Sequence, residues 1–183
     1  MMKKTFKCWS DDLVRIIYPT FIRPHLEFAS SVWNPNRKRD IDTLEKVQRR
    51  ATKTIESRHL SYEKRIKKLG LTTLEQRRHR GDFIQCFKII HGLDKVNWCT
   101  ENKIQGNCKK DLNSRRHNLQ LTRELVQNCE SRHFFLMNRI ATPWNNLPVK
   151  IVNAKSVNCF KNALDKHLEH INWKTHTYSE RFC

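Results

Sequence analysis

The chain has 183 residues, of which 36 are Lys or Arg and 18 are Asp or Glu, so its formal net charge is +18. This length fits one domain or two small ones and excludes a large multidomain enzyme. Leu, Ile, Val and Phe make up about a quarter of the residues, which is enough for a modest core. The excess of positive charge favours a polyanionic partner, because unneutralised charge loosens a compact state.

Targeting and redox features are sparse. The sequence has no run of about 20 apolar residues for a membrane span and no apolar stretch typical of a signal peptide near residue 1. Seven cysteines form an odd number without tight spacing, which disfavours a disulfide framework and favours reduced thiols. We therefore expect a soluble intracellular protein without a membrane partner, and the sequence leaves nucleus, cytoplasm and oligomeric state open.

The first half of the chain has the apolar spacing of helices. A first helical stretch covers 13–33, and Pro19 and Pro24 predict a kink or two short helices there. A second helix follows the turn at 34–36. One face of this helix is marked by Ile41, Leu44, Val47, Ala51 and Ile55.

Two further helices are indicated by their ends. Ser61 can cap a short helix that Gly70 ends, with Lys64, Arg65, Lys67 and Lys68 on its exposed side. Thr72 and Glu75 have capping-box spacing and predict a helix that runs towards Gly92. The buried face of this last helix is predicted at Leu74, Ile84, Phe87 and Ile90.

Periodicity fails after residue 93 and returns near residue 131. The stretch 107–118 predicts a basic loop with Lys109, Lys110, Arg115 and Arg116. A short helix at 131–140 is expected to break at 143–148, and a last helix to begin at Ser156. Trp33, Trp144 and Trp173 could stack on unpaired bases, although Trp in amphipathic helices more often lies in a core.

The predicted fold class is therefore all-α. It is a small irregular helical bundle with a basic loop and a looser C-terminal helical part. We assign a helical region to 1–92, a basic loop or linker to 93–130, a C-terminal helical region to 131–173 and a frayed tail to 174–183.

Positive charge is concentrated between residues 37 and 80, where 15 basic residues face 6 acidic ones. A row of cations gains affinity for nucleic acid by releasing counterions, without base-specific geometry. The alternative is that these charges are solvated helix surfaces, but few acidic neighbours accompany them. The predicted nucleic-acid-binding residues are Arg37, Lys38, Arg39, Lys46, Arg49, Arg50, Lys53, Lys64, Arg65, Lys67, Lys68, Arg77, Arg78 and Arg80.

Catalytic and metal motifs are weak. The tetrad Trp9-Ser10-Asp11-Asp12 is similar to a polymerase metal-binding signature, but two-metal chemistry needs a further carboxylate well upstream, and only eight residues precede it. We interpret Asp11 and Asp12 as a helix N-terminus, where negative charge opposes the helix dipole. Zinc sets such as Cys86 with Cys99 and Cys108, or Cys159 with nearby histidines, lack the spacing of a zinc site. No cofactor, metal or catalytic residue is predicted.

Several phrases of the sequence are distinctive when taken together and in order. The phrases are RPHLEFASSVWNP at 23–35, LEKVQRRATK at 44–53, RHLSYE at 58–63, LGLTTLE at 69–75, WNNLP at 144–148 and AKSVNCFK at 154–161. They resemble, in the same order, the C-terminal region of non-LTR (LINE-type, jockey-like) retrotransposon reverse transcriptases, and this resemblance covers nearly the whole chain.

The resemblance implies a thumb-like region that follows the polymerase palm and grips the template-primer nucleic acid. It also implies no role in bond making, because the family's catalytic carboxylates lie upstream of this segment. We therefore expect a non-catalytic fragment of an RNA-directed DNA polymerase that binds RNA or DNA through a basic helical face. The competing interpretation is a protein-interaction remnant, or a translated relic of a mobile element, without a nucleic-acid role.

Overall fold

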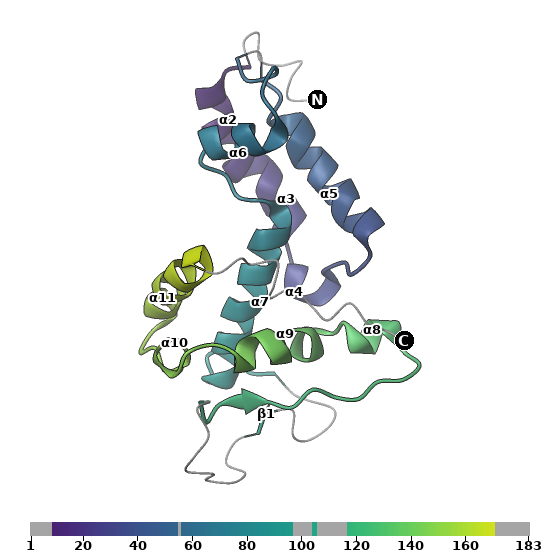
Figure 1. Cartoon of the computed structure of the whole chain (residues 1–183), viewed down its shortest axis with the longest axis vertical. Coiled ribbons are helices and arrows are strands. Elements are labelled where there is room, and N and C mark those ends of the chain that lie inside the picture. The colour runs from purple at the N-terminus through teal and green to yellow at the C-terminus, as the bar shows by residue number, and fades with distance from the viewer. Residues whose placement is uncertain (1–8, 55, 97–103, 106–116, 171–183) are drawn as a thin grey trace. The chain divides into compact units, whose positions relative to one another are not determined.

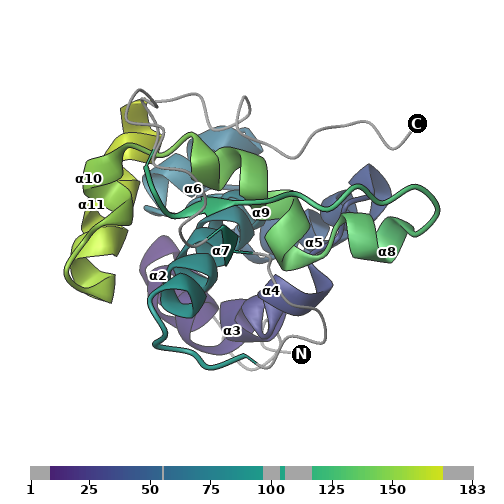
Figure 2. The same ribbon diagram turned by 90° about the horizontal axis from the view of Figure 1, so that it is seen from below.

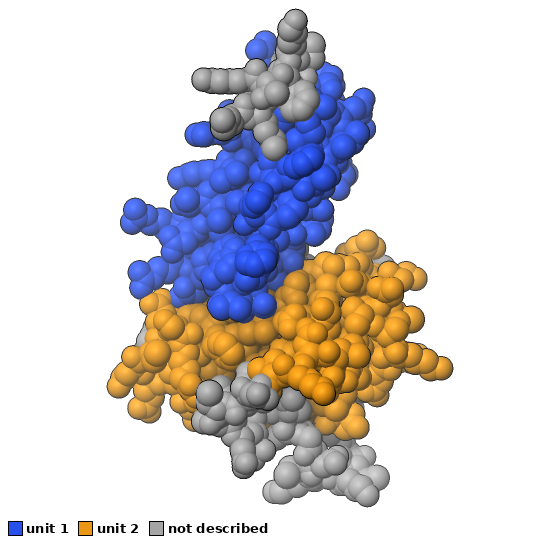
Figure 3. All heavy atoms as spheres, turned by 180° about the vertical axis from the view of Figure 1, so that it is seen from behind, with its two compact units in different colours: residues 1–79 blue, residues 80–183 orange. Residues whose placement is uncertain are grey.

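The computed structural model describes residues 9–54, 56–96, 104–105 and 117–170, and it confirms the predicted all-α fold (Figure 1). The chain divides into two compact units, unit 1 at residues 1–79 and unit 2 at residues 80–183 (Figure 3). This division falls inside a helix, whereas the sequence analysis sets the first boundary at residue 92. The cations predicted at 109–116, Ile55 and the tail at 174–183 lie outside the described residues.

The described part of unit 1 begins with four short helical segments. They are α2 (Asp11–Ile17), the π-helical turn η1 (Tyr18–Ile22), α3 (Arg23–Glu27) and α4 (Ser30–Trp33). Pro19 lies in η1 and Pro24 at the start of α3, and neither residue has an amide proton to donate. The predicted interruption of the first helix is therefore confirmed.

The next helices are α5 (Lys38–Ala51) and α6 (Tyr62–Lys68). The Ser61 side chain caps α6 by accepting from the Lys64 amide, as predicted. Gly70 ends the helix with a positive φ of 65°, while the amide of Leu71 donates to the Ile66 carbonyl at 2.8 Å. These are the bonds of a helix end that requires a left-handed residue.

Helix α7 (Leu74–Ile90) begins one residue away from its predicted capping pair. The reciprocal bonds join Thr73 and Gln76, in place of Thr72 and Glu75, at 3.2 Å each. The prediction of Thr72 and Glu75 is thus wrong by one position, because the Thr72 carbonyl instead accepts a hydrogen bond from the Gln48 side chain. Gly92 lies two residues after the end of α7 and has a positive φ of 68°.

The interior of unit 1 combines a small apolar cluster with buried polar side chains. The cluster contains Trp9, Val14, Ile17, Tyr18, Ala51 and Leu69. On α5 the buried residues are Glu45, Gln48 and Ala51, while Val47 is exposed. The predicted apolar stripe is therefore wrong at Val47, because α5 turns a hydrogen-bonding face inwards.

Unit 2 contains the end of α7, two short strands and four helices in its described part. The elements are β1 (Ile104–Gln105), β2 (Gln120–Leu121), α8 (Glu130–His133), α9 (Leu136–Asn145), α10 (Val149–Val152) and α11 (Val157–His170). The strands are antiparallel, with Ile104 opposite Leu121. Figures 1 and 2 both show α10 lying beside α11.

The predicted break at 143–148 is confirmed at 146–148, between α9 and α10, but it begins later than predicted, because α9 continues through Pro143 to Asn145. Pro143 lies in the last turn and cannot donate to the carbonyl four residues earlier, so α9 loses one backbone hydrogen bond close to its end, while the proline ring is buried. The neighbouring Trp144 is fully buried and donates its indole N–H to the Leu119 carbonyl at 2.8 Å. The predicted start of the last helix at Ser156 is confirmed by the Ser156 hydroxyl, which accepts from the Cys159 amide.

The core of unit 2 is largely aromatic and aliphatic. Phe87 stacks on Phe160 with ring centroids 4.3 Å apart, and Trp144 packs against the same Phe160. Beside this core, the buried Arg139 guanidinium forms two hydrogen bonds, at 2.7 and 2.9 Å, to the Asp82 carboxylate on α7. The unit boundary falls within α7 because the apolar residues of its second half, Phe83, Cys86, Phe87 and Ile89, belong to the core of unit 2.

Among the described helices, none combines the length and the apolar character needed to cross a bilayer.

Candidate nucleic-acid interface

Helix α5 carries five of the fourteen predicted basic residues, and all five are exposed. Arg39, Lys46 and Arg50 are exposed and follow one another at intervals of seven and four residues, so they lie along one helix face. Arg49 is also exposed, and its guanidinium lies 5.1 Å from the centre of the Tyr62 ring. The remaining exposed cations flank these residues. They are Arg37, Lys38 and Lys53.

The opposite face of α5 is held by a buried polar network. Gln48 accepts from the Tyr18 hydroxyl at 2.6 Å and donates to the Tyr62 hydroxyl oxygen at 2.8 Å and the Thr72 carbonyl at 2.9 Å. Tyr62 donates to one carboxylate oxygen of Glu45, and the Leu74 amide donates to the other. Such directional contacts fix the rotation of α5 and therefore decide which of its residues face water.

The two tyrosines of this network stay protonated. Burial raises the pKa of Tyr62 well above its ordinary value, and the hydrogen bond to the Glu45 carboxylate raises it further. Burial also raises the pKa of Tyr18, with a further contribution from the charge of Glu45. Both hydroxyls therefore remain donors over the physiological pH range.

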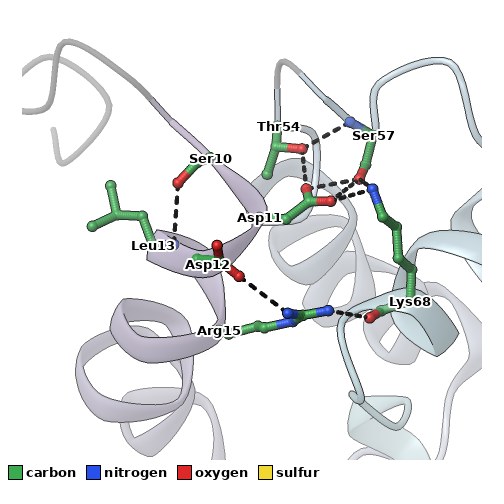
Figure 4. A network of polar contacts seen from close by, with 8 residues as sticks. All are labelled: Ser10, Asp11, Asp12, Leu13, Arg15, Thr54, Ser57 and Lys68. Carbon is green, nitrogen blue, oxygen red and sulfur yellow. Dashed lines mark hydrogen bonds and ion pairs between the residues drawn. The ribbon is translucent and has the colours of Figure 1, made fainter.

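Helix α6 presents a smaller set of cations. Lys64 and Lys67 are exposed, whereas the Lys68 ammonium forms an ion pair with Asp11 at 2.5 Å (Figure 4). Asp11 also accepts from the hydroxyls of Thr54 and Ser57. Lys68 is thus engaged within unit 1, although nearly half of its side chain is exposed.

Asp11 lies in the first turn of α2, together with Asp12, and Ser10 caps the helix by accepting from the Leu13 amide. This confirms the interpretation of the Asp11-Asp12 pair as a helix N-terminus. Burial acts to raise the pKa of Asp11, but hydrogen bonds from Lys68, Ser57 and Thr54 outweigh it and lower the pKa to about 2. The carboxylate is therefore a structural anion that joins α2 to α6.

Arg65 is wrongly placed on the exposed side of α6 by the sequence pattern. It is buried, its Nη1 donates to the Leu60 carbonyl at 2.5 Å, and its guanidinium lies over the Tyr62 ring. The helix is only two turns long, so its inward face must include one of the four closely spaced cations. Arg65 supports the loop before α6 and is not available as a surface contact.

Arg77 and Arg78 also point into unit 1 instead of forming an exposed row. Arg77 forms an ion pair with Glu27 through Nε and a second contact through Nη2 at 3.1 Å. Arg78 is fully buried, and its Nε donates to the Asn34 side chain at 3.0 Å. The structure thus uses these two arginines to hold α3 and the residue that follows α4.

Arg80 belongs to unit 2, where it forms hydrogen bonds of 2.6 and 2.8 Å to the Asp165 carboxylate on α11. The structure therefore does not bring the predicted set together as one row. Its exposed members are concentrated on α5, with a smaller group on α6, and its arginines on α7 are engaged in internal ion pairs or hydrogen bonds.

The tryptophans that could stack on bases differ in position. Trp144 is fully buried in the core of unit 2, Trp33 is 40% exposed in unit 1, and Trp173 lies outside the described residues. Cys86, considered above as a metal ligand, is buried in the same core as Trp144, and burial raises the pKa of its thiol. In the described part of the chain, no three His, Cys, Asp or Glu side chains form a group that could hold a metal ion.

Sequence reasoning missed Glu45, Gln48 and Phe28. Glu45 and Gln48 are spaced three residues apart between cations and look like surface residues in a charged helix. Phe28 is 79% exposed at the end of α3, although its type suggests burial. Pro19 and Pro24 within the first helical stretch indicated an irregular segment, but not which side chains it leaves exposed.

Comparison with protein-family models, with curated proteins and with solved structures finds no match to this chain.

Proposed function

We propose that the chain binds nucleic acid through phosphate contacts along the exposed face of α5. As the resemblance to non-LTR reverse transcriptases implies, this face would contribute to the grip on a template-primer and would catalyse no reaction. The observation that carries the proposal is that Arg39, Lys46 and Arg50 share an exposed helix face.

A cationic helix face of this kind suits a phosphate backbone. Each neutralised phosphate releases condensed counterions, so the contact gains free energy with any base sequence. Arginine adds planar donors that match phosphate oxygens. Because Glu45 and Gln48 fix the rotation of the helix, the cations are presented without a large ordering cost.

A salt series tests the proposal. Binding of a labelled duplex and of an RNA·DNA hybrid should weaken linearly with the logarithm of salt concentration. Combined replacement of Arg39, Lys46 and Arg50 by Gln should reduce the magnitude of this slope by about two to three. The matched control replaces Lys150, Lys155 and Lys166, three exposed lysines of unit 2, by Gln and changes the net charge equally.

The control decides between a specific face and overall charge. An equal loss in both triple variants would contradict the assignment to α5. If the wild-type chain bound no oligonucleotide at low salt, nucleic-acid binding would be contradicted, and the interpretation as a protein-interaction remnant would remain. A primer-extension assay with Mg²⁺ should give no incorporation, and any extension would contradict the proposal that the chain is non-catalytic.

A further inference from the structure

Two aromatic side chains are exposed at and after the turn that joins α3 to α4, with Phe28 in the turn and Trp33 at the end of α4. Phe28 is 79% exposed and Trp33 is 40% exposed. The indole N–H of Trp33 donates to the Phe28 carbonyl at 2.6 Å, so the second ring is tied to the backbone that carries the first. Burial of large aromatic side chains is favourable, and exposed ones that gather in one place therefore indicate a contact surface.

This turn is held in place on both sides by consecutive residues of α7. Before the turn, Glu27 pairs with Arg77. After it, the Asn34 side chain accepts from the buried Arg78. The segment between these anchors contains Ala29 with a φ of 51°, a left-handed conformation that persists only where neighbouring contacts enforce it. The aromatic side chains are therefore carried on a rigid support, which lowers the ordering cost of a contact.

Positive charge follows the aromatic pair directly along the chain. Arg37, Lys38 and Arg39 are all exposed, and Arg37 lies four positions after Trp33 in the chain. The Cα atoms of these two residues are thus at most about 14 Å apart. Figure 1 shows α4 leading into the start of α5, the helix that carries the basic face.

A ligand that suits both features must combine negative charge with accessible ring faces. An unpaired nucleic-acid strand has both, because its phosphates meet cations while its bases stack on aromatic side chains. A fully paired duplex keeps its base faces within the helical stack. An apolar protein partner would match the rings but would gain nothing from three adjacent cations.

We propose that Phe28 and Trp33 form a stacking platform for unpaired nucleotides beside the basic face of α5. This inference rests on the proposed function and adds to its phosphate contacts a preference for a strand with accessible bases. Stacking depends on the ring face shared by all bases, so the platform accepts single-stranded RNA and single-stranded DNA alike.

The test measures fluorescence anisotropy of the full chain with three labelled probes. They are a uridine RNA and a thymidine DNA of about 12 nucleotides, within the range of single-strand sites, and a blunt duplex of the same length. Phe28→Ala should weaken binding of both single strands by roughly 5-fold to 100-fold, as expected for the loss of one stacked base. Binding of the blunt duplex should change by less than about twofold.

Matched variants separate stacking from apolar contact. Phe28→Leu keeps an apolar side chain without a ring and should lose affinity like Phe28→Ala, whereas Phe28→Trp should retain it. Val32→Ala, at a neighbouring residue that is 75% exposed and not aromatic, should have no effect. Trp33→Ala also removes the hydrogen bond to the Phe28 carbonyl, so the Phe28 series is decisive.

Each other outcome overturns the inference in a recognisable way. Unchanged single-strand binding by Phe28→Ala, with duplex binding intact, would contradict the platform and leave the proposed function standing. Wild-type affinity in Phe28→Leu together with a loss in Phe28→Ala would replace stacking by simple apolar contact. Failure of the wild-type chain to bind any probe at low salt would contradict both proposals.

Discussion

The fully buried side chains of unit 1 include Gln48, Thr52, Ser57 and Arg78, whereas those of unit 2 are mostly aromatic and aliphatic, with Trp144 and Phe160 among them. Polar interiors add little net stability, because each hydrogen bond replaces one made to water. They do impose direction, since a buried donor must face its acceptor. Unit 1 therefore uses its interior to fix which residues of α5 face outwards, while unit 2 gains stability from apolar burial.

The largest effect on stability is expected at the buried ion pair between Arg139 and Asp82, which is an exception to the apolar interior of unit 2. Replacing Arg139 by Ala removes the guanidinium that pairs with the fully buried Asp82 carboxylate and should lower the free energy of unfolding by about 3 to 5 kcal/mol. Urea unfolding followed by circular dichroism measures the loss, and hydrogen exchange assigns it to unit 2.

The control for Arg139 removes both charges together. A double variant, Asp82→Leu with Arg139→Met, should regain most of the lost stability, because it leaves no buried charge unpaired. A loss below about 1 kcal/mol in the Arg139→Ala variant would show that water reaches Asp82, contrary to a dry core in unit 2.

A smaller loss is expected at Gln48 in unit 1. Gln48→Leu keeps the size of the side chain but leaves the Tyr18 hydroxyl and the Thr72 carbonyl without this partner. The free energy of unfolding should fall by about 2 to 3 kcal/mol. The exposed neighbour Lys46→Gln should change it by less than about 0.5 kcal/mol. Equal effects of the two variants would show that the network does not hold α5.

Helix ends were predictable because their signals are local. Ser61, Gly70 and Ser156 act on backbone groups within three or four residues, so spacing alone identifies them. The shift from Thr72 to Thr73 at α7 has a different origin. Two neighbouring threonines offer the same chemistry, and the distant Gln48 decides between them by binding the Thr72 carbonyl.

The positive charge of the candidate site was predictable from the sequence, but which of its cations are exposed was not. A run of arginines indicates many cations, yet the pattern does not reveal that Arg77 and Arg78 meet Glu27 and Asn34, about 50 residues earlier in the chain. Likewise, Val47 has the type of a core residue, but Glu45 and Gln48 take the inward face because their partners lie on other elements. Long-range polar partners carry no signal in a single sequence.

Acid should weaken unit 1 through Asp11. Its pKa is lowered from 3.8 to about 2, so the stabilisation is complete above about pH 4 and is lost as the pH falls towards 2. Asp11→Asn should lower the free energy of unfolding by about 1 to 2 kcal/mol at pH 7, because nearly half of the Lys68 side chain remains in water. Thermal unfolding measured between pH 7 and pH 2 should show the difference in stability between the wild-type chain and the Asp11→Asn variant becoming smaller as the pH falls.

The neighbouring Asp12 serves as the control, since its side chain is mostly exposed and forms an ion pair with Arg15 of the same helix. Asp12→Asn should change stability by a few tenths of a kcal/mol at most. If the difference between Asp11→Asn and the wild-type chain persisted unchanged at pH 2, the ion pair with Lys68 would not be its cause.

The smallest predicted effect compares the two units directly, at one glycine in each. Gly70 and Gly92 have φ values of 65° and 68°, and an added Cβ would meet no atom within 4 Å at either position. Replacement by Ala should therefore cost only the left-handed conformation, about 1 kcal/mol each. Asn tolerates this conformation better and should cost less. Hydrogen exchange should rise in α6 for Gly70→Ala and in the last turns of α7 for Gly92→Ala. Equal changes throughout both units would mean that they unfold together, so that the polar interior of unit 1 is not separable from the apolar core of unit 2.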